Sequence, residues 1–341
     1  MSHTAKTPPT ANAIADLPDA KDGTVAYDTA AGKPVARING AWESIAGGGG
    51  GFGTPTVVYD DGAAIGNTDQ IQGDIPANWK YFDSSLKGLV IGTSCTSIGS
   101  NAFGFCSGLT GSLVIPDSVT SIGSYAFYNC NNLTSLTIGN SVTSIGNNAF
   151  VSCLGLTGNL IIPDSVTTIG NYAFQSCAGF TGSLTIGNSV TSIGNYAFQS
   201  CTGLTGSLVI PDSVTSIGSY AFENCTNLTG DLVIPDSVTT IGSYAFDYCT
   251  SLTSLVIPNS VTTIGIFAFG GMTILTTAYL ATPFANIPTG GFGSGAFYGS
   301  GLTTVYANDA VANGWTLGAG QTVGGKTGVT VIDWTNYPNI P

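Results

Sequence analysis

Residues 119–141 read Val119-Thr-Ser-Ile-Gly-Ser-Tyr-Ala-Phe-Tyr-Asn-Cys-Asn-Asn-Leu-Thr-Ser-Leu-Thr-Ile-Gly-Asn-Ser141, and close copies of this unit fill the middle of the chain. A unit of this length cannot bury its own apolar face and is stabilised only between neighbouring copies. The sequence therefore predicts a repeat solenoid. The Ile-Gly dipeptide that marks each copy returns after 23 or 24 residues, at Ile98, Ile122, Ile145, Ile169, Ile193, Ile217, Ile241 and Ile264.

Each unit contains one triplet with the spacing of a short strand, such as Leu136-Thr-Ile138. Alternation of apolar and polar residues turns both apolar side chains into the coil. A Pro or a Gly then ends the strand, and the Ala-Phe pair that follows is expected to place its Phe in the interior. Some units carry one extra Gly, such as Gly111, where we expect a bulge before the strand. The fold class predicted is mainly β with short turns.

The apolar pattern Leu-x-x-Leu-x-Ile-x-x-Ser-Val-x-x-Ile-Gly-x-x-Ala-Phe-x-x-Cys resembles the BspA-like, or treponemal-type, leucine-rich repeat. The match covers residues 86–307. The resemblance implies parallel short strands along one side of a curved solenoid. It also implies a surface or adhesion role, which most members of that family have, and it carries no catalytic residues.

The chain is predicted to have five parts. The solenoid follows a small β module, a glycine-rich linker and a cap, and a second cap closes it. In order, these parts are residues 1–46 (N-terminal β anchor module), 47–53 (linker), 54–85 (N-terminal cap), 86–307 (leucine-rich-repeat solenoid) and 308–341 (C-terminal cap).

Residues 23–45 are predicted to form three short strands, with a turn at 28–33 and a two-residue hairpin signal at Asn39-Gly40. The stretch resembles small β modules near the N-termini of bacteriophage tail, fibre and other virion proteins. The resemblance implies that residues 1–46 contact other virion proteins. A module this small cannot bury a core, so we expect it to dock on a neighbour or to form a homo-oligomer.

Charge is scarce, because only 8% of residues are charged and the formal net charge is -12. Between Lys87 and Lys326 there is no Lys or Arg. Nucleic acid is therefore excluded as a ligand, since neutralising phosphates requires basic side chains. No run approaches the ~18 apolar residues of a membrane span, and the start lacks the apolar region of a secretory signal, so we expect no membrane insertion.

Catalysis is not expected. The sole histidine, His3, lies near the chain terminus, whereas a nucleophilic triad needs a rigidly placed base. One array mixes carboxylates with amides, and we interpret it as turn-forming side chains, with cation binding or glycosidase-like chemistry as the alternatives. No cofactor is expected. This array is Asp117, Asn140, Asp164, Asn188, Asp212, Asp236 and Asn259.

Seven cysteines occupy one repeat position, and we interpret them as buried free thiols that pack as small hydrophobes. Disulfides between coils are the alternative, although parallel side chains point the same way and the count is odd. Metal binding is disfavoured because no Cys-x-x-Cys occurs. The seven are Cys106, Cys130, Cys153, Cys177, Cys201, Cys225 and Cys249.

Two rows of Ser and Thr also recur. The Ser row, from Ser118 to Ser260, is expected to satisfy backbone groups inside the coil. The Thr row, from Thr120 to Thr262, is expected to face outward as solvated surface, with an ice-binding or carbohydrate-binding face as the alternative.

Two further rows are the candidate binding residues. Strand positions that point outward form an apolar stripe, and tyrosines form a second row. Exposed apolar strips are often interaction sites, whereas strand propensity alone also selects Val and Thr, and the tyrosines could pack with only their hydroxyls wet. The stripe is Val114, Thr137, Ile161, Thr185, Val209, Val233 and Val256, and the tyrosines are Tyr172, Tyr196, Tyr220 and Tyr244.

These observations predict a non-enzymatic virion protein that serves as a fibre, a decoration or a receptor-binding element at the virion surface. It would bind a glycan or protein of the host surface through its repeats. The first alternative is a BspA-like adhesin of the bacterial cell surface, and the second is a purely structural capsid decoration.

Overall fold

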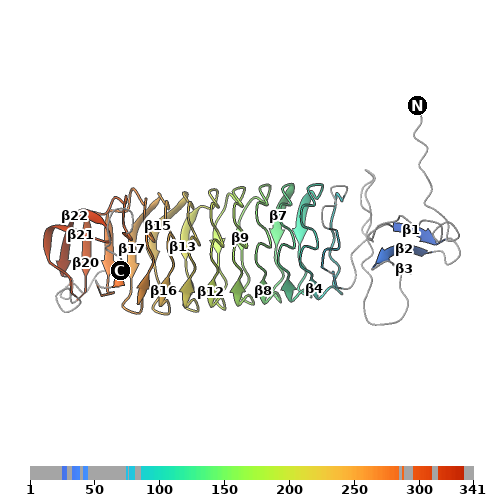
Figure 1. The fold of residues 1–341 in the computed structure, drawn as a ribbon, viewed down its shortest axis with the longest axis horizontal. Coiled ribbons are helices and arrows are strands. Elements are labelled where there is room, and N and C mark those ends of the chain that lie inside the picture. Colours follow the sequence, from blue (N-terminus) through green and yellow to red (C-terminus); the bar gives the residue numbers. More distant parts are fainter. Residues whose placement is uncertain are drawn as a thin grey trace, which may run out of the picture.

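Successive repeat units form successive rungs along the long axis of the molecule (Figure 1). The predicted repeat solenoid is therefore confirmed. No helix in the described part of the chain is long and apolar enough to span a bilayer. The computed structural model describes residues 74–75, 77–80, 86–283, 286–287, 295–308 and 314–333, and the backbone of 25–28, 33–38 and 41–44.

One side of each coil is built from the predicted Leu-x-Ile strands, which pair in parallel with their neighbours, and we call it the long-strand face. An antiparallel hairpin, β21 (Gly318–Val323) and β22 (Lys326–Asp333), ends it, with β22 parallel to the strand before. The other strands are β5 (Gly111–Val114), β7 (Leu133–Thr137), β9 (Leu160–Ile161), β11 (Leu184–Thr185), β13 (Gly206–Val209), β15 (Leu228–Val233), β17 (Leu252–Ile257), β19 (Thr277–Leu280) and β20 (Thr304–Ala307).

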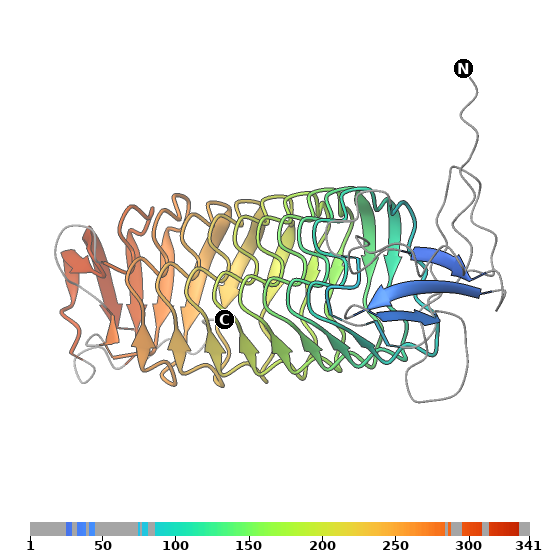
Figure 2. The same ribbon diagram turned by 45° about the vertical axis from the view of Figure 1, so that its right-hand side comes forward.

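A second parallel sheet, which the sequence analysis did not predict, lies on another side of the same coils, and we call it the short-strand face (Figure 2). Each of its eight strands has only two residues, one outward Ser or Thr and one Ile that turns into the core. The strands are β4 (Ser97–Ile98), β6 (Ser121–Ile122), β8 (Ser144–Ile145), β10 (Thr168–Ile169), β12 (Ser192–Ile193), β14 (Ser216–Ile217), β16 (Thr240–Ile241) and β18 (Thr263–Ile264).

The third side, which we call the turn face, contains the Tyr-Ala-Phe segments. Coils are joined here by backbone hydrogen bonds. The Tyr172 N–H donates to the Asn195 carbonyl at 2.8 Å, and the Phe174 N–H donates to the Ala197 carbonyl at 2.8 Å. Tyr172 and Ser176 both have positive φ, 60° and 58°, and the same pair of positions repeats from coil to coil. Left-handed residues turn the chain sharply enough to wrap it around the buried Phe.

The core is the predicted one. Every Phe of the Ala-Phe pairs is fully buried, and these rings stack from coil to coil. Phe150 and Phe174, for example, lie 5.2 Å apart between centroids with an interplanar angle of 4°. The row is Phe103, Phe127, Phe150, Phe174, Phe198, Phe222, Phe246, Phe269 and Phe297.

The bulge predicted at the extra glycines is also present. Gly111 and Gly230 have φ values of 80° and 81°, and the pairing register shifts next to each. Only Gly adopts this backbone without a penalty, which explains why the longer units need it.

The ends of the stack differ in detail from the expected boundaries. Ile75 forms a parallel bridge with Ile98, and the Trp79 ring stands edge-on against Phe103 at 5.6 Å, so coil structure is present before residue 86. Residues 89–91, which carry the first Leu-x-Ile triplet of the predicted solenoid, do not form a strand. At the other end the side chain of Trp315 is buried.

Three antiparallel strands confirm the prediction for residues 23–45. They are β1 (Val25–Asp28), β2 (Lys33–Ile38) and β3 (Ala41–Ser44), in the order β1-β2-β3. The register pairs Ile38 with Ala41, as a two-residue hairpin requires. The linker at 47–53 and His3 lie outside the described residues, as do most of residues 1–46 and 54–85.

Candidate binding face

The predicted stripe lies on the outer surface of the long-strand face, and its apolar members are unusually exposed. Val209 is 68% exposed, Ile161 55%, Val114 53% and Val233 50%. Thr137 and Thr185 are also exposed, and Val256 is half-buried. Register explains the row, because Val209 pairs with Val233 and Val233 pairs with Val256 on adjacent strands.

The stripe is longer than the sequence analysis expected. Tyr279 pairs with Val256, Tyr306 pairs with Tyr279, and the two tyrosine rings stack at 5.1 Å. Tyr279 was overlooked because Ala278 replaces the first Leu of the triplet. The sequence does contain a signal for this position, because Ala278 and Leu280 are apolar residues on either side of Tyr279. In the structure Ala278 and Leu280 are buried and Tyr279 is half-buried.

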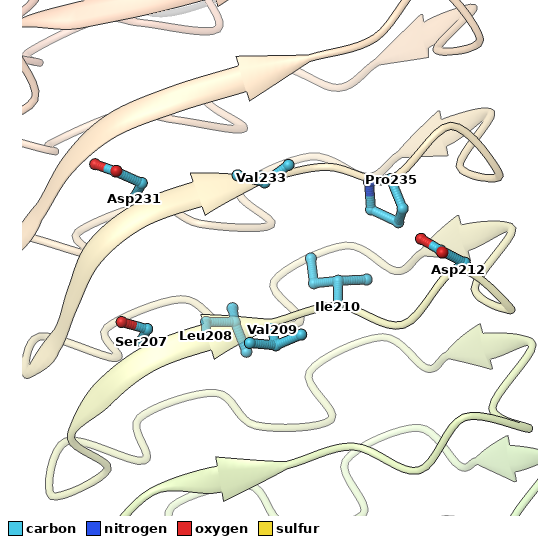
Figure 3. A pocket seen from close by; sticks show the side chains of 8 residues that line it. All are labelled: Ser207, Leu208, Val209, Ile210, Asp212, Asp231, Val233 and Pro235. Carbon is cyan, nitrogen blue, oxygen red and sulfur yellow. The ribbon is translucent and has the colours of Figure 1, made fainter. Parts of the chain in front are cut away.

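A shallow depression of about 340 Å³ lies on the stripe between β13 and β15. Val209 and Val233 lie side by side on neighbouring strands, with Asp231 toward one end of the depression and Asp212 toward the other (Figure 3). Ser207 and Pro235 complete the rim. The site therefore combines an apolar floor with carboxylates at its edges.

The tyrosine row lies on the turn face, where its rings stack on one another. Neighbouring centroids are 4.5 to 4.6 Å apart, with interplanar angles of 6° or 7°, from Tyr172 to Tyr244. Burial, with the neighbouring tyrosine as a second cause, raises the pKa of the Tyr196 and Tyr220 hydroxyls. Because each ring covers its neighbour's face, the row offers edges and hydroxyls to a ligand rather than open faces for stacking a sugar.

Beside the tyrosines runs a ladder of polar side chains, which occupy the position after Phe174, Phe198, Phe222 and Phe246. The Gln175 amide donates to the Gln199 side-chain oxygen, and the Gln199 amide donates to Glu223. The next rung is Asp247, which is buried. Burial, together with the charge of Glu223, raises the pKa of Asp247 to about 6.

Asp247 should therefore make stability depend on pH. Its folded pKa lies above the ordinary value of 3.8, so the folded state binds more protons and stability falls as pH rises from about 4 through about 6. We expect Asp247→Asn to stabilise the protein by about 1–2 kcal/mol at neutral pH, after solvent screening is allowed for, and to give no gain near pH 4. Urea denaturation at both pH values measures this.

The matched control for this experiment is Asp236→Asn, which removes an equal charge from an exposed position and should change stability by less than ~0.5 kcal/mol. An equal gain from Asp247→Asn at both pH values would show that its carboxyl is not titrating in this range.

The cysteines are buried free thiols, as predicted. Each Sγ of the central row donates to a carbonyl of the preceding coil, for example Cys177 to Phe150 at 2.9 Å and Cys201 to Phe174 at 3.1 Å. Burial raises the pKa of both thiols far above the ordinary value. They are therefore held as neutral thiols, whereas the thiolate is the nucleophile and the metal ligand. The described residues contain no group of three or more His, Cys, Asp or Glu placed to hold a metal ion.

The residues of the Asp/Asn array lie in turns, as predicted; the Val119 N–H, for example, donates to the Pro116 carbonyl across Asp117 at 3.0 Å. Asp117 accepts the Asn140 backbone N–H at 2.6 Å, and Asp164 accepts the Asn188 N–H at 2.8 Å. These bonds run from one coil to the next, so both carboxylates connect coils in addition to occupying the predicted turns.

The Ser and Thr rows largely follow expectation. Ser165 and Ser213 donate to the Val142 and Val190 carbonyls of the preceding coil, at 2.7 and 2.6 Å. Ser141, which follows a Gly-Asn rather than a Pro-Asp pair, is exposed instead. The Thr row is exposed, and each hydroxyl donates to the carbonyl of the previous Thr, as from Thr191 to Thr167 at 3.2 Å.

Parallel strands, one per repeat and stacked over a Leu, Ile and Phe core, define a leucine-rich-repeat solenoid. The family model described as the BspA type leucine rich repeat region, in six copies, matches residues 75–205 and 204–313. The chain belongs to this family.

A solved structure with a TM-score above 0.5 has the same fold. A leucine-rich repeat protein from Bacteroides ovatus is 24% identical, with a TM-score of 0.59, over 84% of this chain and 70% of that one. A leucine rich repeat protein from T. pallidum is 29% identical (TM-score 0.37; 44% and 73% covered). A leucine rich cell surface protein from Faecalibacterium prausnitzii is 26% identical (TM-score 0.36; 70% and 83% covered). No curated protein matched the chain.

Proposed function

We propose that this protein is a non-enzymatic adhesion protein that holds a macromolecular partner of a host surface on the stripe of its long-strand face. The observation that supports this is the exposure of one apolar row over successive coils, with Val209 and Ile161 more than half exposed. Large contiguous apolar patches are rare on monomers and mark interaction sites. An extended solenoid face suits a large ligand better than a small substrate.

The absence of catalysis is part of this proposal. The buried thiols are held in their neutral form, and the carboxylates of the long-strand face are spread along an open surface. General acid and base catalysis requires groups of tuned pKa that converge on one substrate.

Replacing Ile161 and Val209 together by lysine should abolish binding to intact host cells, with a loss greater than ~10-fold, because two ammonium groups would be buried in the interface. Both side chains are exposed, so the melting curve should not change. Flow cytometry with labelled protein measures binding.

The control variant places lysine at Thr143 and Thr191, two exposed positions of the Thr row, and changes the net charge equally. It should bind as the unmodified protein does. Loss of binding in this control and not in the stripe variant would move the function to the Thr row. An unmodified protein that binds no host surface would favour the structural decoration role.

We also propose that residues 1–46 attach the solenoid to a virus particle. The resemblance of residues 23–45 to virion modules supports this, and β1 to β3 have the predicted arrangement. Deleting residues 1–46 should leave the repeats folded and soluble but absent from purified particles, as detected by immunoblotting. Detection of the full-length protein only in bacterial envelopes would instead establish the cell-surface adhesin.

A further inference from the structure

Adjacent apolar members of the stripe are most exposed where β13 meets β15. Val209 and Val233, both at least half exposed, form the floor of the 340 Å³ depression. The preceding coil places Thr185 at the same row position, and the following coil places the half-buried Val256 there, so Val209 and Val233 are adjacent apolar members of the row that are both exposed. An apolar side chain of a partner would therefore be covered best at this point.

Negative charge is concentrated at the same place. Along the Asp/Asn array carboxylates alternate with amides, except at Asp212 and Asp236, which occupy adjacent coils about 4.8 Å apart. Asp231 adds a third carboxylate across Val233. Like charges on neighbouring strands repel one another, so this arrangement has an energetic cost in the unbound protein.

Asp231 accepts a hydrogen bond from the Ser254 hydroxyl at 2.5 Å, but other residues of the solenoid do not offset this cost at Asp212 and Asp236. In the part of the chain that the structure describes, no hydrogen bond or ion pair engages the carboxylates of Asp212 and Asp236, whereas Asp117 and Asp164 accept backbone N–H groups. The sequence has no Lys or Arg between Lys87 and Lys326. The repeats between these two lysines therefore supply no cation of their own to neutralise these carboxylates.

Resting on the proposed function, we propose that this part of the stripe binds an extended polypeptide segment in which apolar side chains are flanked by lysine or arginine. Along β15 and beyond, Asp231 lies two residues before Val233 and Asp236 lies three after it, a span of roughly 16 Å in extended chain. A partner segment with cationic groups on both sides of an apolar pair would place its charges beside these carboxylates and its apolar side chains on the valines. A neutral glycan would leave the repulsion between Asp212 and Asp236 in place.

The test uses the full chain and three sets of short synthetic peptides with the same central valines and with lysine, serine or glutamate on both sides. Fluorescence anisotropy should show that the lysine set binds most tightly and weakens strongly with added salt, because opposite charges are screened. Asp212→Asn with Asp236→Asn should weaken this binding by about fivefold, the scale of two exposed ion pairs. The charge-matched pair Asp117→Asn with Asp164→Asn should not.

Equal binding of the serine and lysine sets, or equal losses in the two double variants, would overturn the inference. So would displacement of a bound peptide by neutral dextran at a concentration where the glutamate peptides have no effect. If no peptide binds while the lysine variant at Ile161 and Val209 still abolishes binding to cells, the partner class is wrong and the proposed function stands. If that variant leaves binding to cells intact, the proposed function itself fails.

Discussion

Gly194→Ala is expected to destabilise the solenoid by about 3 kcal/mol or more. A Cβ at Gly194 would lie 2.6 Å from the carbonyl carbon of Gly170 and 2.7 Å from the backbone nitrogen of Asn171. Both contacts are to backbone, which cannot move aside as a flexible side chain can. The coils would have to separate, which would stretch the bond from the Gly194 N–H to the Ile169 carbonyl, now 3.0 Å.

Gly206→Ala provides the control. Gly206 has a φ of 77°, but nothing lies within 4 Å of an added Cβ, so alanine there meets only the backbone penalty of about 1–2 kcal/mol. Guanidinium denaturation of both variants separates the two effects. If Gly194→Ala costs no more than Gly206→Ala, the close approach of the coils does not limit the stacking.

The same geometry explains why Ile-Gly marks the period so strictly. A Cβ added at the glycine of an Ile-Gly pair would lie within 3.0 Å of the backbone of the coil before it, and this holds at Gly123, Gly146, Gly170, Gly194, Gly218, Gly242 and Gly265. The sequence shows the repetition of this dipeptide and therefore predicts the solenoid. It does not show that the cause is close contact between coils, because that depends on how one coil sits on the next.

The second sheet shows where sequence reasoning was insufficient. The Thr-Ser-Ile segment contributes a strand of only two residues, which is too short to show an alternation of apolar and polar residues in the sequence. Its pairing comes from stacking, since Ser121 aligns with Ser97 and with Ser144 in adjacent coils. Local pattern therefore predicted the long-strand face, and tertiary stacking created the short-strand face.

The candidate site was predictable in part. Alternation in each Leu-x-Ile triplet indicated that Val209 and Val233 point outward, as the structure shows. Alternation could not show that the Tyr196 ring stacks face to face with its neighbours. Tyr196 lies in a turn and has a left-handed backbone with a φ of 59°, so the alternation rule for strands does not give the direction of its side chain. The depression between β13 and β15 likewise lies where the pairing register of these two strands shifts, between Ser207 and Val209, which the pattern of one strand alone does not reveal.

Phe174→Ala should cost about 3–5 kcal/mol of unfolding free energy. The ring is fully buried and lies between Phe150 and Phe198, at centroid distances of 5.2 and 5.6 Å. Removing it opens a cavity and takes away contacts from both neighbouring rings. Because repeats are stabilised through their neighbours, the defect should weaken both adjoining interfaces, and the unfolding transition is expected to lose cooperativity.

Thr185→Ala, on the exposed surface of the neighbouring coil, is the control and should change stability by less than ~0.5 kcal/mol. Phe174→Leu should fall between the two, because leucine fills part of the space. Urea denaturation followed by circular dichroism measures all three. A loss below ~1 kcal/mol for Phe174→Ala would mean that the flanking coils collapse into the cavity, and that the stacked Phe row is not what holds successive coils together.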